Sequence, residues 1–347
     1  MRPHVIGFTV ALSTASGMAQ MAGAIPLDQL VVLGDSNVDI GRAASPLVTD
    51  GLPGLPPPNT VGGRSSDGPI IPEFIAERVG VDQLNFAWGG ARTDRVNIIG
   101  GEATFTGLEQ QIDEFAGFLA GTPANPGALY LLWAGSNNLF GDIVSGSFEL
   151  LDKTSEMDVM AAVSGAVGDL ADAVTRLTDL GARNIVVANR ATRPVLSDSA
   201  TPWALPDLDP DVDGLQNPEL NDAAGNALND AIDALIPQLD ADLSSNVLLF
   251  DADAYIRDII AASGANGFLP YSNDPSAYCV NQTDGDCSDL INYDGAHKTS
   301  AVHAVLADDF IAEFDLQAVP APIPLPASVW LMLAPLGGLI AMRRRRR

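Results

Sequence analysis

Apolar residues follow two alternating patterns along this chain. Short, nearly unbroken apolar runs occupy residues 30–33, 84–88, 129–133, 185–188 and 247–250. Runs of this length without polar alternation are typical of parallel strands that are covered on both faces. Between them, apolar residues at helical spacing predict helices over residues 72–79, 108–119, 157–180, 220–239, 255–262 and 299–314. The pattern therefore predicts an α/β fold, with a mostly parallel five-stranded sheet and helices on both of its faces.

Two predicted connections are too long to be plain turns. Residues 43–70 are rich in Pro and Gly, and residues 191–218 are rich in Pro and Asp. Both follow the carboxyl ends of predicted strands, where open α/β sheets bind their ligands. Loops of this length are usually functional or unstructured, so they are candidate lids over a substrate cleft. An ordinary surface loop explains their length equally well.

The two ends of the chain have the composition of processing segments. Residues 1–24 combine Arg2, an apolar run and the sequence Ala-Gly-Ala, which predicts a secretory signal peptide cleaved after Ala24. Residues 319–347 contain a Pro-rich spacer, an apolar run over 327–342 and a terminal block of arginines. This order favours a membrane segment with a cytoplasmic basic flank over a buried terminal helix. We therefore expect an exported protein whose folded domain spans residues 25–318.

Charge and cysteine content agree with export. The chain has 44 acidic and 18 basic residues, and its formal net charge of −26 excludes a general nucleic-acid partner, because phosphate backbones would be repelled. Its two cysteines, Cys279 and Cys287, lie close together in a polar segment. In an exported protein such a pair predicts a disulfide, and no histidine lies nearby to suggest a metal site.

Three short strings carry candidate chemistry. Gly-Asp-Ser ends at Ser36, directly after the first predicted strand, where a helix amino terminus would surround the hydroxyl with N–H groups. A serine nucleophile needs a base, and the base needs a group that orients it. Of the three histidines, His4 lies in the predicted signal peptide and His303 lies inside an apolar helical stretch, where a structural role is expected. His297 is therefore the candidate base, with Asp294 three residues before it.

Longer strings around these residues resemble the conserved blocks of the GDSL, or SGNH, hydrolases. Residues 33–41 read L-G-D-S-N-V-D-I-G and resemble the first block. The sequences N-F-A-W-G-G-A-R-T, W-A-G-S-N-N and Y-D-G-A-H-K-T follow at residues 85–93, 133–138 and 293–299, in the order of the family. The resemblance implies a three-layer α/β/α sandwich and a lipase or esterase of the phospholipase/lecithinase-like branch, acting without a cofactor.

The resemblance also implies a role for each matching residue. Ser36 would be the nucleophile, His297 the base and Asp294 its orienting carboxylate. The oxyanion hole would consist of the Ser36 N–H, the Asn137 side-chain amide and the Gly90 N–H, with Gly89 as the alternative glycine. The chain departs from the family pattern at Asn138, where aspartate is usual, and at Lys298, where proline is common. Asp35 is expected to stabilise the turn rather than to react.

The terminal segment resembles a second family pattern. Residues 323–327 read I-P-L-P-A, similar to the V-P-L-P-A form of the PEP-CTERM sorting tails. In that class a membrane transpeptidase of the exosortase type removes the tail, and the protein reaches the cell surface or the exterior. The resemblance therefore implies membrane contact before processing.

An aspartate-rich string suggests a metal ligand set, but an incomplete one. Asp209, Asp211 and Asp213 match the opening of a calcium-binding loop. Leu220 occupies the twelfth position, where that loop needs a bidentate glutamate. Solvated aspartates explain the string in a chain this acidic, and a structural calcium ion is the alternative.

Three functions remain open at this point. The first is a serine hydrolase that cleaves lipid or short acyl esters. The second keeps the chemistry but removes acetyl groups from an extracellular polysaccharide. The third is an inactive, surface-displayed binding protein on the same scaffold, for which a broken triad would be expected, whereas Ser36, Asp294 and His297 are all present.

Overall fold

A parallel sheet forms the centre of the protein. The computed structural model describes residues 25–43, 61–98, 107–139, 156–191, 218–272, 274–283 and 285–318. Five strands pair in the order β3-β2-β4-β5-β6, and every neighbouring pair is parallel. The strands are β2 (Gln29–Gly34), β3 (Asp82–Asn85), β4 (Ala128–Trp133), β5 (Asn184–Ala188) and β6 (Asn246–Phe250). The predicted fold class is confirmed.

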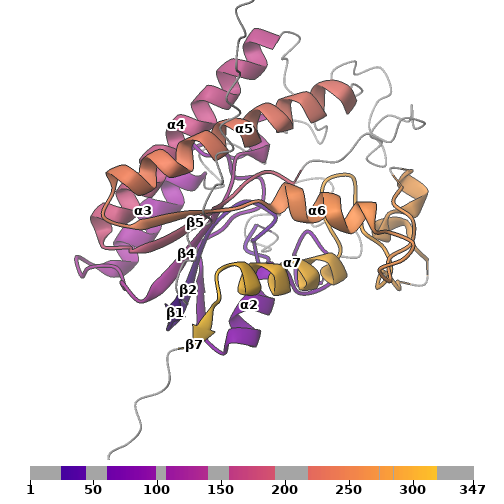
Figure 1. The fold of residues 1–347 in the computed structure, drawn as a ribbon, viewed down its shortest axis with the longest axis horizontal. Coiled ribbons are helices and arrows are strands. Elements are labelled where there is room, and N and C mark those ends of the chain that lie inside the picture. Colours follow the sequence, from indigo (N-terminus) through magenta and orange to yellow (C-terminus); the bar gives the residue numbers. More distant parts are fainter. Residues whose placement is uncertain are drawn as a thin grey trace, which may run out of the picture.

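Helices cover both faces of this sheet (Figure 1). The helices α3 (Leu108–Leu119), α4 (Glu156–Leu180) and α5 (Pro218–Asp242) pack on one face. The helices α2 (Ile71–Val79), α6 (Ala252–Ala261) and α7 (Ser300–Glu313) pack on the other. Alternate strand residues serve the two cores: Val31 and Leu33 of β2 join the first, and Leu30 and Val32 join the second. This explains why β2, β4, β5 and β6 are apolar at nearly every position, whereas β3, at the edge of the sheet, has the sequence Asp-Gln-Leu-Asn.

The second predicted strand is displaced along the chain: the apolar pattern predicts residues 84–88, whereas β3 begins two residues earlier, at Asp82, and ends three residues earlier. Its apolar run continues to Trp88, but β3 stops at Asn85. The Asn85 side chain accepts a hydrogen bond from Ala87 N at 3.0 Å and donates one to Val38 O at 2.8 Å. These bonds join the end of β3 to the loop after β2. Phe86 N and Trp88 N still donate to Val32 O at 2.8 Å and to Gly34 O at 3.0 Å, so the chain stays beside β2 as far as Trp88.

Helix α6 begins three residues earlier than the sequence predicts. Its first residue is Ala252, because the Asp251 carboxylate accepts a hydrogen bond from Ala254 N at 3.0 Å and caps the helix. Short 3₁₀ turns complete the structure at η1 (Ser136–Leu139), η2 (Pro275–Ala277) and η3 (Cys279–Asn281).

Two features join distant parts of the chain. β1 (Pro26–Leu27) pairs in parallel with β7 (Gln317–Ala318), so the two ends of the described fold meet in a small second sheet that the sequence did not predict. Cys279 and Cys287 form the predicted disulfide, which packs with Leu290 and Tyr293 in a small buried cluster. This cluster directly precedes Asp294.

Several sequence predictions fall outside the described residues. They include the signal peptide (1–24), the sorting tail (319–347), most of the two long loops (44–60 and 192–217) and the possible calcium ligands Asp209, Asp211 and Asp213. Within the part of the chain that the structure describes, no helix has the length and apolar character needed to cross a membrane.

Candidate active site

The residues singled out by sequence meet at the carboxyl edge of the sheet. Ser36 follows β2, Gly89 and Gly90 lie in the loop after β3, and Asn137 lies in η1 after β4. His297 comes from the loop before α7. Parallel strands place their carboxyl ends on one edge, which is why segments far apart in sequence converge there.

Ser36, His297 and Asp294 form a continuous hydrogen-bonded chain. His297 Nε2 lies 2.7 Å from Ser36 Oγ, and His297 Nδ1 lies 2.9 Å from Asp294 Oδ2. Since an ionised carboxylate only accepts, Nδ1 carries the proton and Nε2 is left to accept from the serine hydroxyl. The arrangement can therefore take a proton from Ser36 and stabilise the imidazolium that forms.

Asp294 is held in its charged form. Burial alone would raise the pKa of this carboxyl, but the charge of His297 and hydrogen bonds from His297 and Ala296 outweigh burial and lower the pKa to about 2. Two of these bonds come from the backbone: Ala296 N and His297 N donate to Asp294 Oδ1 at 2.6 and 2.7 Å. Asp294 thus also stabilises the conformation of the loop that contains His297.

The turn at Ser36, the candidate nucleophile, differs from the sequence prediction. Residues 36–38 form a turn, and no helix follows within residues 35–43, so a helix amino terminus does not surround Ser36. Asp35 N donates to Trp133 O at 2.9 Å, while Asp35 Oδ1 accepts from Asn37 N at 3.0 Å and from Asn37 Nδ2 at 2.8 Å. Asp35 therefore stabilises the turn that presents Ser36.

Gly34 allows β2 and β4 to approach closely beneath this turn. Its φ is +150°, and a Cβ added there would lie 2.1 Å from Trp133 O. A side chain at this position would push the two strands apart and displace Ser36.

The geometry favours Gly90 over Gly89 as the backbone oxyanion donor. Gly89 N already donates to Asp39 Oδ2 at 2.8 Å. Gly90 has a φ of +78°, and its N–H donates to no acceptor among the described residues. Asn137 Nδ2 donates to Ala91 O at 2.9 Å, which leaves the second N–H of that amide group to meet a substrate.

Asn138, one of the two departures from the family pattern that the sequence resembles, links η1 to the loop after β3. Its Oδ1 accepts from Thr93 N at 3.0 Å, and its Nδ2 donates to Thr93 Oγ1 at 2.7 Å. Thr93 Oγ1 in turn donates to Asp169 Oδ2 at 2.8 Å. An amide can both accept and donate, so asparagine satisfies both groups of Thr93.

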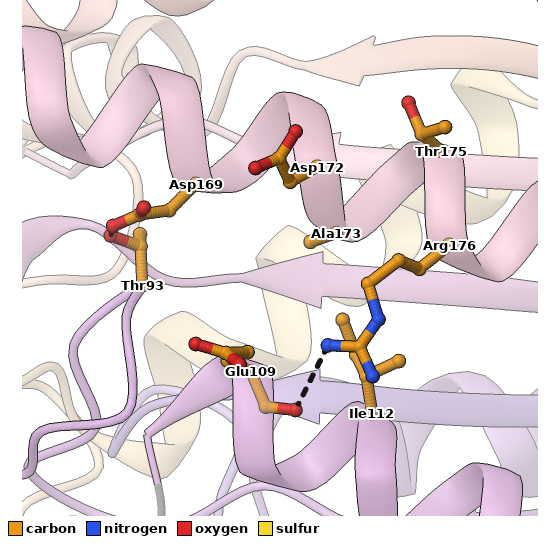
Figure 2. Close-up of a pocket in the computed structure, with 8 residues that line it drawn as sticks. All are labelled: Thr93, Glu109, Ile112, Asp169, Asp172, Ala173, Thr175 and Arg176. Carbon is orange, nitrogen blue, oxygen red and sulfur yellow. Dashed lines mark hydrogen bonds between the residues drawn. The ribbon is translucent and has the colours of Figure 1, made fainter.

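A cavity of about 300 Å³ lies beyond Thr93, between α3 and α4 (Figure 2). Figure 2 shows Thr93 and Asp169 turned towards each other at one end and Arg176 donating to the backbone of Glu109 at the other. None of Ser36, His297 or Asn137 lines this cavity. It is separate from the candidate catalytic centre.

Lys298 and the segment before α2 hold the histidine loop. Lys298, the second departure from the family pattern that the sequence resembles, is buried, and its Nζ donates to Asn292 Oδ1 at 2.9 Å across the base of the loop. In the segment before α2, Ser66 Oγ donates to Lys298 O at 3.2 Å and Asp67 Oδ1 accepts from Ser300 N at 2.7 Å.

His303 is buried in α7, and burial lowers its pKa to about 3.

Two residues that hold the backbone around Ser36 were not predicted from the sequence. Gln111 is fully buried on α3; its Oε1 accepts from Gly34 N at 2.8 Å and its Nε2 donates to Gly34 O at 2.9 Å. Asp39 accepts four backbone N–H groups around the nucleophile loop. A glutamine on the apolar face of a helix was a signal for the first, and the second aspartate of G-D-S-x-x-D-x-G was a signal for the second.

Family comparison agrees with this geometry. Residues 30–310 match the family described as GDSL-like Lipase/Acylhydrolase. The chain belongs to this family. The match covers both the nucleophile turn and the histidine loop, so the resemblance seen in the short strings extends over the described fold. No curated protein matches the sequence.

Two of the solved structures that resemble this GDSL-family chain do so weakly. One is a member of the lipolytic G-D-S-L family from Veillonella parvula, with 12% identity over 83% of this chain and 98% of the other, at a TM-score of 0.41. Another is an active-site mutant of a family two carbohydrate esterase from Clostridium thermocellum, with 10% identity over 84% of this chain and 64% of the other, at a TM-score of 0.43. Likenesses this weak carry no argument about substrate.

Asp35 gives the site a testable pH dependence. Burial raises its pKa to about 6, although Asn37 and the charge of His297 oppose the shift. A carboxyl with a raised pKa in the folded state contributes stability below its unfolded pKa of about 3.9 and loses it as the pH rises towards 6. We expect Asp35→Asn to raise the free energy of unfolding at pH 8 by about 1–3 kcal/mol, with little change at pH 4. Urea unfolding at both values measures this; an equal effect at pH 4 and pH 8 would refute it.

Proposed function

We propose that this protein is an exported serine hydrolase that cleaves carboxylic esters through an acyl-enzyme on Ser36. Membership of the GDSL-like lipase/acylhydrolase family supports ester hydrolysis. The observation that carries the proposal is the 2.7 Å contact between His297 Nε2 and Ser36 Oγ, with Asp294 on the opposite ring nitrogen.

The first half-reaction transfers the acyl group to the enzyme. Ser36 Oγ attacks the ester carbonyl while His297 Nε2 takes the hydroxyl proton. The carbonyl oxygen becomes an oxyanion, which the N–H groups of Ser36 and Gly90 and the amide of Asn137 stabilise. His297 then gives its proton to the departing alcohol as the carbon–oxygen bond breaks.

The second half-reaction returns the enzyme to its starting state. A water molecule attacks the Ser36 ester, and His297 takes a proton from it. The second oxyanion collapses, the acid leaves, and the proton passes back to Ser36 Oγ. Asp294 remains ionised throughout and keeps the imidazole in the required tautomer.

Hydrolysis of p-nitrophenyl esters from acetate to palmitate tests this proposal. We expect the wild-type protein to release p-nitrophenol and the Ser36→Ala variant to lose about 10⁴-fold or more in kcat, because no other group takes the place of the nucleophile. The acyl-length profile separates a short-acyl esterase from a lipase. Turnover restricted to acetylated polysaccharide would assign the second substrate class, and turnover retained by Ser36→Ala would refute the nucleophile.

We propose export on separate grounds. The signal-like sequence of residues 1–24 and the I-P-L-P-A tail support it, and so does the Cys279–Cys287 disulfide, since such bonds persist in oxidising compartments. In the producing cell, a tail-processing transpeptidase would remove the apolar and arginine-rich segment. The intact mass of protein recovered from that cell tests this: we expect a chain that begins at Ile25 and lacks the terminal arginines. Recovery of the full-length chain would contradict it.

A further inference from the structure

Asp39 binds the nucleophile loop to the loop after β3. Its Oδ1 accepts from Gly41 N at 2.9 Å and Arg42 N at 2.6 Å, and its Oδ2 accepts from Ala43 N at 3.0 Å. These three donors belong to its own loop. The fourth donor is Gly89 N, fifty residues away, at 2.8 Å from Oδ2. The side chain is almost completely buried, so water does not substitute for these bonds.

The Gly89–Gly90 segment that Asp39 holds lies against the nucleophile. A Cβ added to Gly89 would lie 3.9 Å from Ser36 Cβ and 3.1 Å from Ala43 Cβ. The backbone at Gly89 therefore packs beside Ser36, and a side chain at this position would crowd Ala43 of the nucleophile loop.

Every other polar group of this segment is fixed as well. Gly89 O accepts from Asn97 Nδ2 at 2.9 Å, and Gly90 O accepts from Ile98 N at 2.9 Å. Only the Gly90 N–H has no acceptor among the described residues. A donor held rigidly but left unused next to a nucleophile is suited to an oxyanion, because it needs no reorganisation when charge develops.

A second contact joins the same two loops at the surface. The Arg42 guanidinium lies 4.7 Å from the centre of the Trp88 ring and pairs with Glu114 of α3 at 2.8 Å. Trp88 directly precedes Gly89, so the Arg42–Trp88 contact and the Asp39–Gly89 hydrogen bond both restrain the backbone of residues 88–89. Of these two contacts, only the one made by the buried Asp39 carboxylate involves Gly89 itself.

We infer that Asp39 is a positioning residue of the oxyanion hole, which acts by fixing Gly89 so that the Gly90 N–H faces the carbonyl oxygen of an ester bound at Ser36. This rests on the proposed ester hydrolysis. Asp39 touches no reacting atom; its effect passes through the backbone. An error of about 1 Å in the placement of such a donor is enough to slow a reaction about 10²-fold.

The test compares Asp39→Ala and Asp39→Asn with the wild-type full chain. Alanine removes all four acceptor bonds, whereas asparagine keeps the shape but presents an N–H to two of the four backbone donors. Asp251→Asn is the matched control, since Asp251 also accepts from a backbone N–H but caps α6 after β6, at the far edge of the sheet. Two readouts apply: kcat and KM on p-nitrophenyl butyrate, and hydrogen exchange of the amides of residues 86–91 and of β4.

We expect Asp39→Ala to lower kcat about 10²-fold with KM within about threefold of wild type, because the lost interaction acts on the transition state. We expect faster exchange at residues 86–91 and unchanged exchange in β4. Asp39→Asn should fall between Asp39→Ala and wild type, and Asp251→Asn should keep wild-type kcat.

Wild-type kcat in Asp39→Ala would overturn the inference. So would a loss of kcat that comes with equally accelerated exchange in β4, since that would indicate general destabilisation. If the folded wild type cleaves no ester, the proposed function fails, and exchange decides the role of Asp39 alone: unchanged protection at residues 86–91 in both variants would then overturn it.

Discussion

Replacing His297 with alanine is expected to lower kcat for ester hydrolysis by about 10⁴-fold or more, as far as the loss of the nucleophile itself. Ser36 Oγ has its hydrogen bond to this ring, 2.7 Å from Nε2, and without it the hydroxyl keeps its proton at neutral pH. The measurement is kcat on p-nitrophenyl butyrate, with circular dichroism to show that the variant is folded.

His303→Gln is the matched control for His297. His303 is buried in α7 and, with its pKa lowered to about 3 by burial, it is neutral near pH 7. We expect this variant to lose stability but to retain kcat within a few-fold. Comparable losses of kcat in the two variants would contradict the assignment of the base, and so would an active His297→Ala.

Replacing Asp294 with asparagine is expected to lower kcat by about 10⁴-fold while the fold persists. An asparagine amide can donate to His297 Nδ1, which would move the ring proton to Nε2 and prevent it from accepting from Ser36. The substitution also removes the charge that stabilises the imidazolium. The measurement is the kcat of Asp294→Asn beside that of Asp286→Asn, an exposed carboxylate inside the Cys279–Cys287 disulfide loop.

The pKa of Asp294 sets the sign of a related pH effect. Because this pKa is lowered to about 2 in the folded protein, the stability that the carboxylate contributes is complete above its unfolded value near 3.9 and is lost only as the pH falls towards 2. Asp294→Asn should therefore destabilise the protein at pH 7 and have little effect near pH 2. A variant with wild-type kcat, or one that destabilises equally at both pH values, would contradict this role.

The sheet could be predicted from sequence because its information is local. Strands covered on both faces are apolar at nearly every position, and β2, β4, β5 and β6 all appear as such runs. The end of β3 could not be predicted in this way. The apolar run continues through residues 86–88, but the regular strand ends at Asn85, whose side chain bonds to Ala87 N and Val38 O, and beyond it only Phe86 N and Trp88 N still donate to β2. Hydrophobicity does not report hydrogen bonds between loops that are distant in sequence.

The candidate site likewise has residues that could be predicted from sequence and residues that could not. Ser36, Asp294 and His297 lie in short strings, and their spacing carries their chemistry. The residues that hold them act over long separations: Asp39 reaches Gly89 across 50 residues, Gln111 reaches Gly34 across 77, and Ser66 reaches Lys298 across 232. The sequence also predicted a helix at Ser36, where a turn braced by Asp35 forms instead. These contacts depend on the folded arrangement of the loops.

The most direct test of the central claim is to label the folded protein with a fluorophosphonate and map the adduct by peptide mass spectrometry. Attack by Ser36 Oγ on phosphorus expels fluoride and leaves a stable phosphonate ester, so the probe reports an activated serine without assuming a substrate. We predict a single adduct, on the peptide that contains Ser36, absent from Ser36→Ala and formed far more slowly by His297→Ala. An adduct on another residue, or no adduct on the folded wild-type protein, would contradict the claim that Ser36 is the nucleophile.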